Sequence, residues 1–386
     1  MKALVVGCGI AGSVTAVALQ RAGIAVTVCE AYDRSADGVG AYLSLTTNGL
    51  SILDELGLLR EVVARGFTTP RLVVSTFDGK ELGTLSYGAP LRDGTAAQTL
   101  RRADLYQVLR DACARTGAQV VYGKRLVGAE TGADGVVARF ADGSTEHADV
   151  LIGADGLRSV ARRIIDPDAP ALRYTGVTET GGYARGLRLD AEPGVLRLIY
   201  GRGGLFCYIP HPDGEVWWFT QPPSKAEPDR DELAATPQDV LRARILAQVA
   251  GDRGPAARII EATEEILRPW AGYDMPSLRT WRRGRMVLVG DAAHAASPAS
   301  GQGASMALED ALVLAKCLRD VDGVPQALAE FETRRRDRVE RVVAHGKRNG
   351  DLGVVGRIAA PLVFRHMIDV RWMTEFRETW AAPARR

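Results

Sequence analysis

The stretch KALVVGCGIAGSVTAVALQRAGIAVTVCE (residues 2–30) decides the fold. An apolar strand runs into Gly7-x-Gly9-x-x-Gly12, a helical pattern follows, and a second apolar strand ends at Glu30. The first glycine permits a tight turn, the second lets a pyrophosphate approach the backbone, and the third lets the helix pack closely on the strand. This order predicts a βαβ unit with a parallel sheet and a site for an adenine dinucleotide, in which Glu30 accepts the ribose hydroxyls.

The composition argues against several other classes of protein. With 386 residues and 46% hydrophobic content, the chain is long enough for a large core and two subdomains. The net charge of +2 gives no strong attraction to nucleic acid or to an anionic membrane. The five cysteines are scattered without a C-x-x-C, which favours free thiols in a reducing cytosol. Glycines interrupt the N-terminal apolar stretch and no apolar run is long enough for a membrane span, so we expect a cytoplasmic protein.

A second acid–glycine pair ends the strand in DVLIGADGLRSVARR (149–163). Asp155-Gly156 stands at the strand end, and a helical pattern with several arginines follows. An ordinary strand–turn–helix junction with a solvated basic face would look the same. This motif therefore gains its meaning from the motifs around it.

A third such pair ends the buried strand in MVLVGDAAHAASPASGQGAS (286–305), where Asp291 follows a glycine. A carboxylate there can bind a polyol or ribose hydroxyl but not a phosphate, because like charges repel. Gly301, Gly303 and Ala304 leave backbone N–H groups bare at the start of a helix predicted over 304–319. Such a helix start stabilises a negative charge that faces it.

His294 in the same loop invites a catalytic or metal-binding interpretation. No other histidine or cysteine lies at a metal-ligand spacing from it, so we expect a structural role in the loop and no metal site. The chain also has no G-x-S-x-G motif and no evident Ser/His/Asp set. We therefore expect no catalytic side chain of the hydrolase kind.

Between these motifs the pattern changes to alternating strands. Residues 71–97 and about 173–275 contain strand patterns with turns such as Asp78-Gly79, which predict a second, antiparallel sheet. A buried strand of the parallel type returns at 286–289 without any low-complexity linker. The two subdomains are therefore expected to be interleaved along the chain.

The motifs, taken in order, resemble the class A flavoprotein monooxygenases, the para-hydroxybenzoate hydroxylase family. The residues that carry the resemblance are Gly7-x-Gly9-x-x-Gly12 with Glu30, Arg101-Arg102-Ala103-Asp104-Leu105, Asp155-Gly156, and Gly290-Asp291-Ala292-Ala293-His294 through Pro298 and Gly301-Gln302-Gly303. The likeness covers residues 1 to about 345. It implies an α/β fold with a Rossmann-like FAD-binding domain of the para-hydroxybenzoate hydroxylase type at 1–70, 98–172 and 276–345. An inserted antiparallel-sheet substrate domain would occupy 71–97 and 173–275, and a C-terminal helical segment would occupy 346–386.

The resemblance also implies a set of FAD-binding residues. The pyrophosphate would lie at the first glycine turn with Arg102 beside it, Glu30 would bind the adenosine ribose, and Val127 would lie near the adenine. Asp291 would bind a ribitol hydroxyl, and the loop from Pro298 to Ala304 would border the isoalloxazine ring. The full set is Gly7, Gly9, Ile10, Ala11, Gly12, Glu30, Ala31, Arg34, Arg102, Val127, Asp155, Gly156, Asp291, Pro298, Gly301, Gly303 and Ala304.

The implied reaction is oxygen transfer. NADPH or NADH would act as a transient reductant of FAD, O2 would add to form a flavin C4a-hydroperoxide, and one oxygen atom would pass to an aromatic or polyketide-like small molecule. Because the flavin carries this chemistry, no catalytic side chain is expected. Two alternatives remain open, a non-oxygenating flavin reductase or dehydrogenase of the same fold and a non-enzymatic FAD-binding protein. The chain could be a monomer or a homodimer.

The substrate contacts are the least defined part of the site. We expect them among Tyr42, Leu45, Arg185, Phe206, Tyr208, Trp218 and Pro298, with Leu43, Leu196 and Phe219 as further candidates. Core packing is the competing explanation for about half of the aromatic residues. The two-residue period of a strand places Phe206 and Tyr208 on one face of the sheet.

Overall fold

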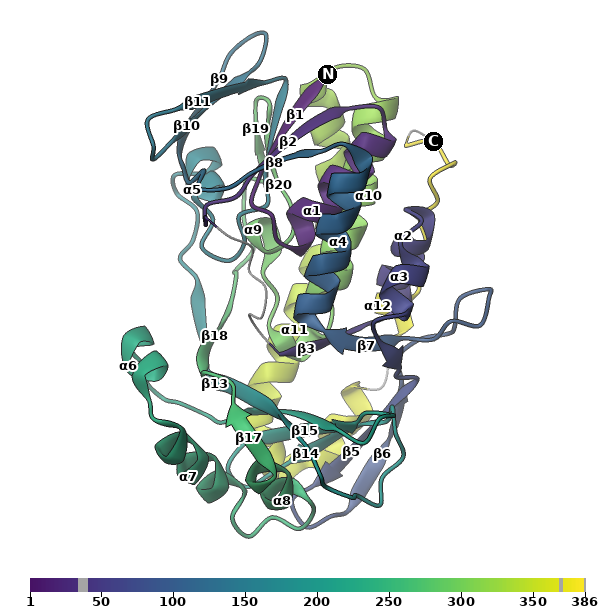
Figure 1. The fold of residues 1–386 in the computed structure, drawn as a ribbon, viewed down its shortest axis with the longest axis vertical. Helices are drawn as coiled ribbons and strands as arrows, with labels where there is room; N and C mark the ends of the chain where they lie inside the picture. Colours follow the sequence, from purple (N-terminus) through teal and green to yellow (C-terminus); the bar gives the residue numbers. More distant parts are fainter. Residues whose placement is uncertain (34–40, 368–370, 385–386) are drawn as a thin grey trace.

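The computed structural model of the chain describes residues 1–33, 41–367 and 371–384, with side chains described through residue 348 and again from 372 (Figure 1). Arg34, which is predicted to contact FAD, lies outside the described residues.

The opening βαβ unit forms as predicted. β1 (Lys2–Val6) leads into α1 (Ile10–Arg21), and β2 (Ala25–Cys29) returns beside β1 in parallel. The six-stranded sheet has the order β19-β20-β12-β1-β2-β8. Its other strands are β8 (Gln119–Val121), β12 (Val150–Gly153), β19 (Arg282–Arg283) and β20 (Met286–Leu288).

All neighbouring strands in this sheet are parallel except the edge pair β19–β20. The carboxyl ends of β1, β2, β12 and β20 therefore meet at one edge. Parallel α/β sheets bind their ligands at this edge, because the loops that leave the strands converge there. The three acid–glycine motifs, far apart in the sequence, lie on three adjacent strands.

Long helices cover this sheet. α1 packs against α4 (Arg102–Thr116) and against α10 (Gly303–Asp320), as the central column in Figure 1 shows. Residues 305–318 of α10 are all buried, which confirms the predicted buried helix after the glycine loop. The shorter helices on this half of the molecule are α2 (Thr47–Glu55), α3 (Leu59–Val63), α5 (Val160–Ile165) and α9 (Asp291–His294), with a 3-10 turn at Pro298–Ser300.

A second large sheet forms the other half of the molecule. Its order is β17-β13-β16-β15-β14-β5-β6, and β18 also pairs with β13. Its strands are β5 (Arg71–Thr76), β6 (Glu81–Ser86), β13 (Arg173–Ala184), β14 (Leu196–Tyr200), β15 (Leu205–Pro210), β16 (Val216–Gln221), β17 (Thr263–Ile266) and β18 (Trp270–Asp274). The pairs are antiparallel as predicted, except that β5 runs parallel to β14. The helices α6 (Arg230–Ala235), α7 (Gln238–Val249) and α8 (Ala256–Glu261) follow β16 and precede β17.

Two three-stranded sheets complete the fold. One consists of β9 (Leu126–Thr131), β10 (Val136–Phe140) and β11 (Thr145–Ala148). The other consists of β3 (Tyr42–Leu45), β4 (Phe67–Thr68) and β7 (Gln98–Arg101), and Figure 1 shows β3 and β7 between the two large sheets.

The C-terminal part differs from the expectation of a separate helical segment at 346–386. α11 (Val324–Met367) is one continuous helix that crosses residue 345, and the short α12 (Arg371–Thr374) follows. Residues 375–384 are not helical. We propose that residues 1–345 divide into an FAD-binding part and an antiparallel-sheet substrate part, because each large sheet has its own buried cluster. The boundary at 345 has no counterpart in the helix.

Candidate functional site

The first glycine turn divides its glycines into two kinds. Gly7 has φ +99°, and a Cβ there would lie 2.5 Å from the carbonyl oxygen of Ala154. A Cβ on Gly12 would lie 1.9 Å from the carbonyl oxygen of Gly7, so both glycines are required by the fold itself. In the described part of the chain, a Cβ on Gly9 would meet only the Cε1 atom of Tyr106, at 3.8 Å. The open space at Gly9, in front of the N-terminus of α1, fits the approach of a pyrophosphate.

Glu30 follows β2 and lies next to this turn. Its carboxylate accepts the backbone N–H of Cys8 at 2.7 Å and that of Tyr32 at 3.1 Å. The backbone N–H of Lys124 donates to the carbonyl of Glu30 at 2.7 Å, and the chain then enters β9 at Leu126. Val127 is exposed on that strand. Because the Lys124–Glu30 bond joins the two segments, Glu30 and Val127, both expected to border the adenosine, lie on neighbouring segments.

Asp155 has a role in the fold that the sequence did not reveal. Its carboxylate accepts the backbone N–H groups of Val160 at 2.7 Å and Ala161 at 3.0 Å, and it bonds to the hydroxyl of Ser159. These bonds satisfy the N-terminus of α5. Gly156 has φ +71°, which fits the turn between strand and helix. The Asp155 carboxylate is thus engaged by its own segment.

Arg162 was not singled out from the sequence and proves to be a central connector. Its buried guanidinium donates to the carbonyls of Leu157 at 2.6 Å and Ala292 at 3.0 Å. Burial lowers the pKa of Arg162. These bonds tie the segment after β12 to α9 after β20. A basic residue at this spacing looked like part of a solvated face, which is why the sequence did not reveal it.

The loop after β20 brings Asp291 to the same edge. Gly290 has φ +58°, and a Cβ there would lie 2.8 Å from the Cβ of Ala11, so this loop lies directly against α1. The side chain of Asp291 is exposed and makes no hydrogen bond to another described residue. A Cβ on Gly303 would lie 4.0 Å from the Asp291 carboxylate, which places this acid beside the start of α10. Pro298 and Gly301 are exposed and Ala304 is half-buried along the same loop.

A buried network holds the base of this loop. His294 is bonded through Nε2 to the Asp310 carboxylate at 2.6 Å, and the same carboxylate accepts the backbone N–H of Gly290 at 2.9 Å. The buried guanidinium of Arg335 bonds to Asp310 and Glu309, each at 2.7 Å. Burial acts to raise the pKa of Asp310, but the charges of His294 and Arg335 outweigh it and hold that pKa at about 2. The predicted structural role of His294 agrees with these contacts.

The network continues to the far end of the loop. Asn48 on α2 donates to Gln302 at 3.0 Å and to Glu309 at 2.7 Å. Thr46 lies 3.1 Å from the Ser305 hydroxyl, so the start of α2 and the start of α10 are joined by side chains. Both ends of the loop are therefore fixed, which is what a preorganised cofactor site needs.

One face of the second sheet presents aromatic rings to β3 and β4. The ring of Trp217 lies 5.6 Å from Tyr42, 5.2 Å from Phe67, 5.3 Å from Tyr183 and 5.0 Å from His211. The hydroxyl of Tyr42 is buried and has no hydrogen-bond partner among the described residues. Burial raises the pKa of Tyr42 well above its usual value, so this hydroxyl is a neutral donor and acceptor.

Charged groups border this aromatic cluster. Glu215 accepts Arg101 at 2.9 Å, Arg185 at 2.8 Å and the indole N–H of Trp217 at 2.9 Å. The guanidinium of Arg101 lies 4.4 Å from the centre of the Tyr183 ring. Arg102 follows as the first residue of α4 and is exposed. The aromatic cluster and the start of α4 are thus adjacent.

The chain matches a family model described as an FAD binding domain over residues 1–345. The chain belongs to the class A flavoprotein monooxygenases. It is an FAD-dependent oxidoreductase, and the family predicted from the spaced motifs is confirmed. The open space at Gly9, the acceptor at Glu30 and the exposed carboxylate of Asp291 fit the pyrophosphate, ribose and polyol of this cofactor.

Two relatives match this monooxygenase over about nine-tenths of its sequence. The aurachin C monooxygenase/isomerase of Stigmatella aurantiaca is 33% identical over 360 residues, which are 92% of this chain and 90% of that protein. The FAD-dependent urate hydroxylase of Klebsiella pneumoniae is 32% identical over 355 residues, 91% and 90% of the two chains. The crystal structure of Klebsiella pneumoniae HpxO with FAD and uric acid superimposes with a TM-score of 0.84 at 28% identity, covering 97% of this chain and 96% of that one. The predicted fold class is confirmed by this superposition.

The structure changes the substrate candidates of the monooxygenase. Phe206, Tyr208 and Trp218 do share one face of the sheet, but they pack in a core with residues of α7 and α8 such as Leu241 and Ile259. That face looks away from β3, so their expected substrate role finds no support in this packing. The next residue along each strand has the opposite orientation. The alternation of side chains could be predicted from the sequence, but not which face of the sheet the helices cover.

The remaining candidates differ in their surroundings. Leu45 is fully buried in the core of the cofactor part, whereas Tyr42 contacts the aromatic cluster. Arg185 is mostly exposed and bonded to Glu215. Leu196 and Phe219 lie on the face of the sheet that carries Trp217.

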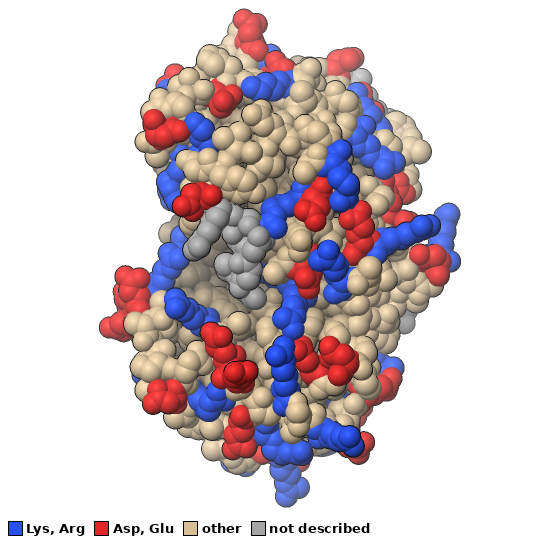
Figure 2. Space-filling model, viewed as in Figure 1, with Lys and Arg blue, Asp and Glu red and all other residues tan. Residues whose placement is uncertain are grey.

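Figure 2 shows one face of the molecule with its charged side chains coloured. On the face in Figure 2, acidic and basic side chains are interspersed. In residues 1–33, 41–367 and 371–384, no helix has the length and apolar character needed to cross a membrane. The same residues contain no group of three or more His, Cys, Asp or Glu side chains arranged for a metal ion.

Proposed function

We propose that this chain is an NAD(P)H-dependent FAD monooxygenase that hydroxylates an aromatic or polyketide-like small molecule. The observation that carries the proposal is the packing of the aromatic cluster around Trp217 against Tyr42 of β3. β3 pairs with β7, which leads into α4, and α4 packs on α1, the helix that begins at the glycine turn. A flat apolar substrate can stack on such rings while the flavin faces it from the other side.

The proposed cofactor residues fall into groups according to the part of FAD that each would hold. Gly9 and the start of α1, with Ile10 and Ala11, would hold the pyrophosphate, and Arg102 would lie beside it. Glu30, Ala31 and Val127 would border the adenosine. Asp291 would bind the ribitol chain, and the segment Pro298 to Ala304 would lie along the ring.

FAD, when bound, supplies hydride acceptance and the activation of dioxygen. The residues of the chain position the cofactor and the substrate and enclose them. The buried network of His294, Asp310 and Arg335 fixes the positions of Asp291 and of the start of α10. The N–H groups at that helix start stabilise negative charge in front of them. Aromatic and aliphatic side chains around Trp217 exclude water from the substrate.

The substrate is proposed to be planar. The relatives are named for urate and aurachin C, and 3-amino-4-hydroxybenzoate appears in the name of another relative that is 34% identical. The buried hydroxyl of Tyr42 supplies one hydrogen-bonding group to a polar substituent. Arg101 and Glu215 supply charge at the border of the cluster.

The test is NAD(P)H oxidation by the purified holoenzyme with urate, 3-amino-4-hydroxybenzoate and salicylate under isotopically labelled O2. We expect at least one planar aromatic compound to stimulate NAD(P)H oxidation and to gain one labelled oxygen atom. NAD(P)H oxidation without label in any product would instead identify a reductase or dehydrogenase. No oxidation of NADH or NADPH under any condition would leave a non-enzymatic FAD-binding protein.

A further inference from the structure

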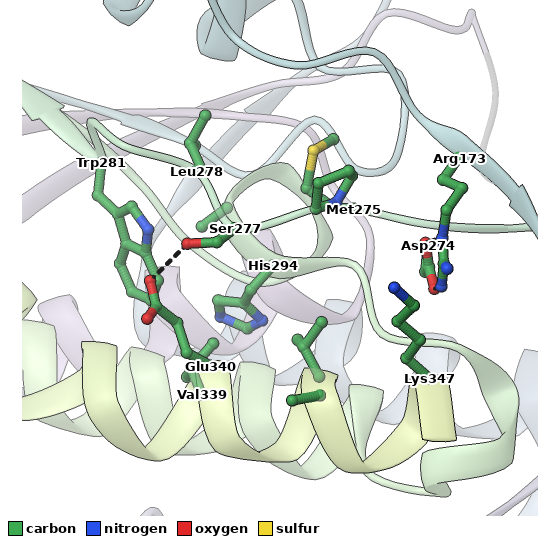
Figure 3. A pocket seen from close by; sticks show the side chains of 14 residues that line it. Arg173, Asp274, Met275, Ser277, Leu278, Trp281, His294, Val339, Glu340 and Lys347 are labelled. Atoms are coloured by element: carbon green, nitrogen blue, oxygen red, sulfur yellow. Dashed lines mark hydrogen bonds and ion pairs between the residues drawn. The ribbon is translucent and has the colours of Figure 1, made fainter. Parts of the chain in front are cut away.

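A cavity of about 280 Å³ lies between α9, α11 and the segment that joins β18 to β19. Figure 3 shows its lining, which is mostly apolar and includes Met275, Leu278, Val339 and Val343. None of the residues proposed above for FAD or for the substrate lines it. We call it the His294 cavity, because His294 lines its inner wall.

Two buried nitrogen atoms in this wall lack partners. The side chain of His294 is 3% exposed, and with Nε2 bonded to Asp310 its Nδ1 has no hydrogen bond among the described residues. Trp281 is 1% exposed, and its indole N–H has no partner there either. The centres of the Trp281 and His294 rings lie 5.5 Å apart. Buried polar groups are nearly always hydrogen-bonded, so two neighbouring exceptions beside a cavity indicate a missing partner.

The chemistry of the missing partner follows from the two atoms. A carboxylate can only accept, so the His294 nitrogen that faces Asp310 carries a proton; Nδ1 is then an acceptor if the ring is neutral and a donor if it is charged. The indole N–H of Trp281 is a donor. A single hydroxyl group satisfies both atoms, because it accepts from Trp281 and either donates to Nδ1 of a neutral His294 ring or accepts from the Nδ1–H of a charged one.

The outer end of the cavity carries a positive charge. Glu340 accepts the Ser277 hydroxyl at 2.8 Å and pairs with Arg336 at 2.9 Å, and Asp274 is paired with Arg173. Lys347 is exposed and has no partner among the described residues. Figure 3 shows Trp281 and Lys347 on opposite sides of His294. A ligand with its hydroxyl at Trp281 therefore meets Lys347 with its other end.

We propose that the His294 cavity is a second small-molecule site that binds a phenol carrying a carboxylate, with the hydroxyl at His294 and Trp281 and the carboxylate at Lys347. The apolar lining accepts the ring between these two ends. The ligand is joined to the flavin loop by hydrogen bonds, since His294 bonds to Asp310 and Asp310 bonds to the N–H of Gly290.

The test is calorimetric titration of the FAD-loaded protein with 4-hydroxyphenylacetate. Phenylacetate lacks the hydroxyl and 4-hydroxyphenylacetamide lacks the charge, so each should bind roughly fivefold to tenfold more weakly. Lys347→Gln should remove the preference for the acid over the amide. Arg348→Gln is the matched control, because it removes an exposed cation of the same helix that does not line the cavity.

A blocking variant separates this site from the substrate site. Ala344 is exposed at the rim, so Ala344→Trp fills the cavity mouth without disturbing the core and should abolish binding. The proposal is overturned if 4-hydroxyphenylacetate does not bind at millimolar concentration. It is equally overturned if binding is unchanged in Lys347→Gln and Ala344→Trp, or if it depends on Trp217 instead. These outcomes do not depend on whether the protein hydroxylates any compound.

Discussion

Gly9→Val isolates the cofactor contact from the stability of the fold. Among the described residues outside its own turn, a Cβ at position 9 would meet only the Tyr106 Cε1 within 4 Å, at 3.8 Å, which is an ordinary van der Waals distance. The backbone of Gly9 has φ −77° and ψ −166°, which any residue adopts. The free energy of unfolding of the FAD-free protein should therefore change by less than about 1 kcal/mol.

FAD binding should respond quite differently. The valine side chain occupies the space in front of the N-terminus of α1, where the pyrophosphate has to come close to the backbone. Overpacking of this kind costs about 1–3 kcal/mol, which corresponds to an affinity lower by roughly fivefold to 150-fold. Quenching of FAD fluorescence on titration with FAD-free protein measures the affinity, and urea unfolding measures the stability.

Gly12→Ala is the matched control. Its Cβ would lie 1.9 Å from the carbonyl oxygen of Gly7, so α1 must move away from β1. We expect the FAD-free protein to lose about 2 kcal/mol or more of unfolding free energy. An unchanged FAD affinity in Gly9→Val would refute the reasoning, as would a loss of stability equal to that of Gly12→Ala.

Three further predictions concern other parts of the site. Asp291→Ala should purify with little or no flavin while the FAD-free protein keeps its stability within about 0.5 kcal/mol, because the Asp291 side chain makes no hydrogen bond to a described residue; full flavin absorbance would contradict it. Trp217→Phe should raise KM for an aromatic substrate severalfold, whereas Trp218→Phe, which loses its bond to Thr263 in the core, should lower the unfolding free energy by about 1–2 kcal/mol and leave KM unchanged. Steady-state kinetics measures KM and urea unfolding measures stability, so together they show which face of the sheet contacts the substrate and which is core. Arg335→Met removes the buried cation shared by Glu309 and Asp310, while Glu309 keeps Arg338 and Asp310 keeps His294, and it should cost about 3 kcal/mol in urea unfolding; the half-buried Arg334→Met, which loses only its i,i+4 pair with Glu330, should cost less than about 1 kcal/mol.

The sequence predicted best what depends on local geometry. Gly7 and Gly12 are needed at their positions by contacts of the backbone, and such contacts leave a fixed spacing that can be read directly. Glu30 and Asp291 follow strands whose apolar runs are plain in the sequence.

What depends on distant packing could not be predicted. Arg162 and Arg335 look like surface charges in the sequence, because nothing local says that carbonyls or carboxylates of remote segments surround them. The choice between the two faces of β15 and β16 is of the same kind. Alternation identified Phe206 and Tyr208 as neighbours, but only the position of α7 and α8 tells which face is core.

The place of β20 beside β12 has a consequence for how the protein is made. The edge of β12 stays without its neighbour until Met286–Leu288 has been synthesised, roughly 130 residues later, and translation of that length takes on the order of ten seconds. During this time the nascent chain exposes an apolar strand edge, which is a hazard for aggregation. α1 likewise waits for α10 to cover it. Fragments that end before residue 286 should therefore need chaperones to stay in solution, and the cofactor can be captured only after nearly the whole chain has left the ribosome.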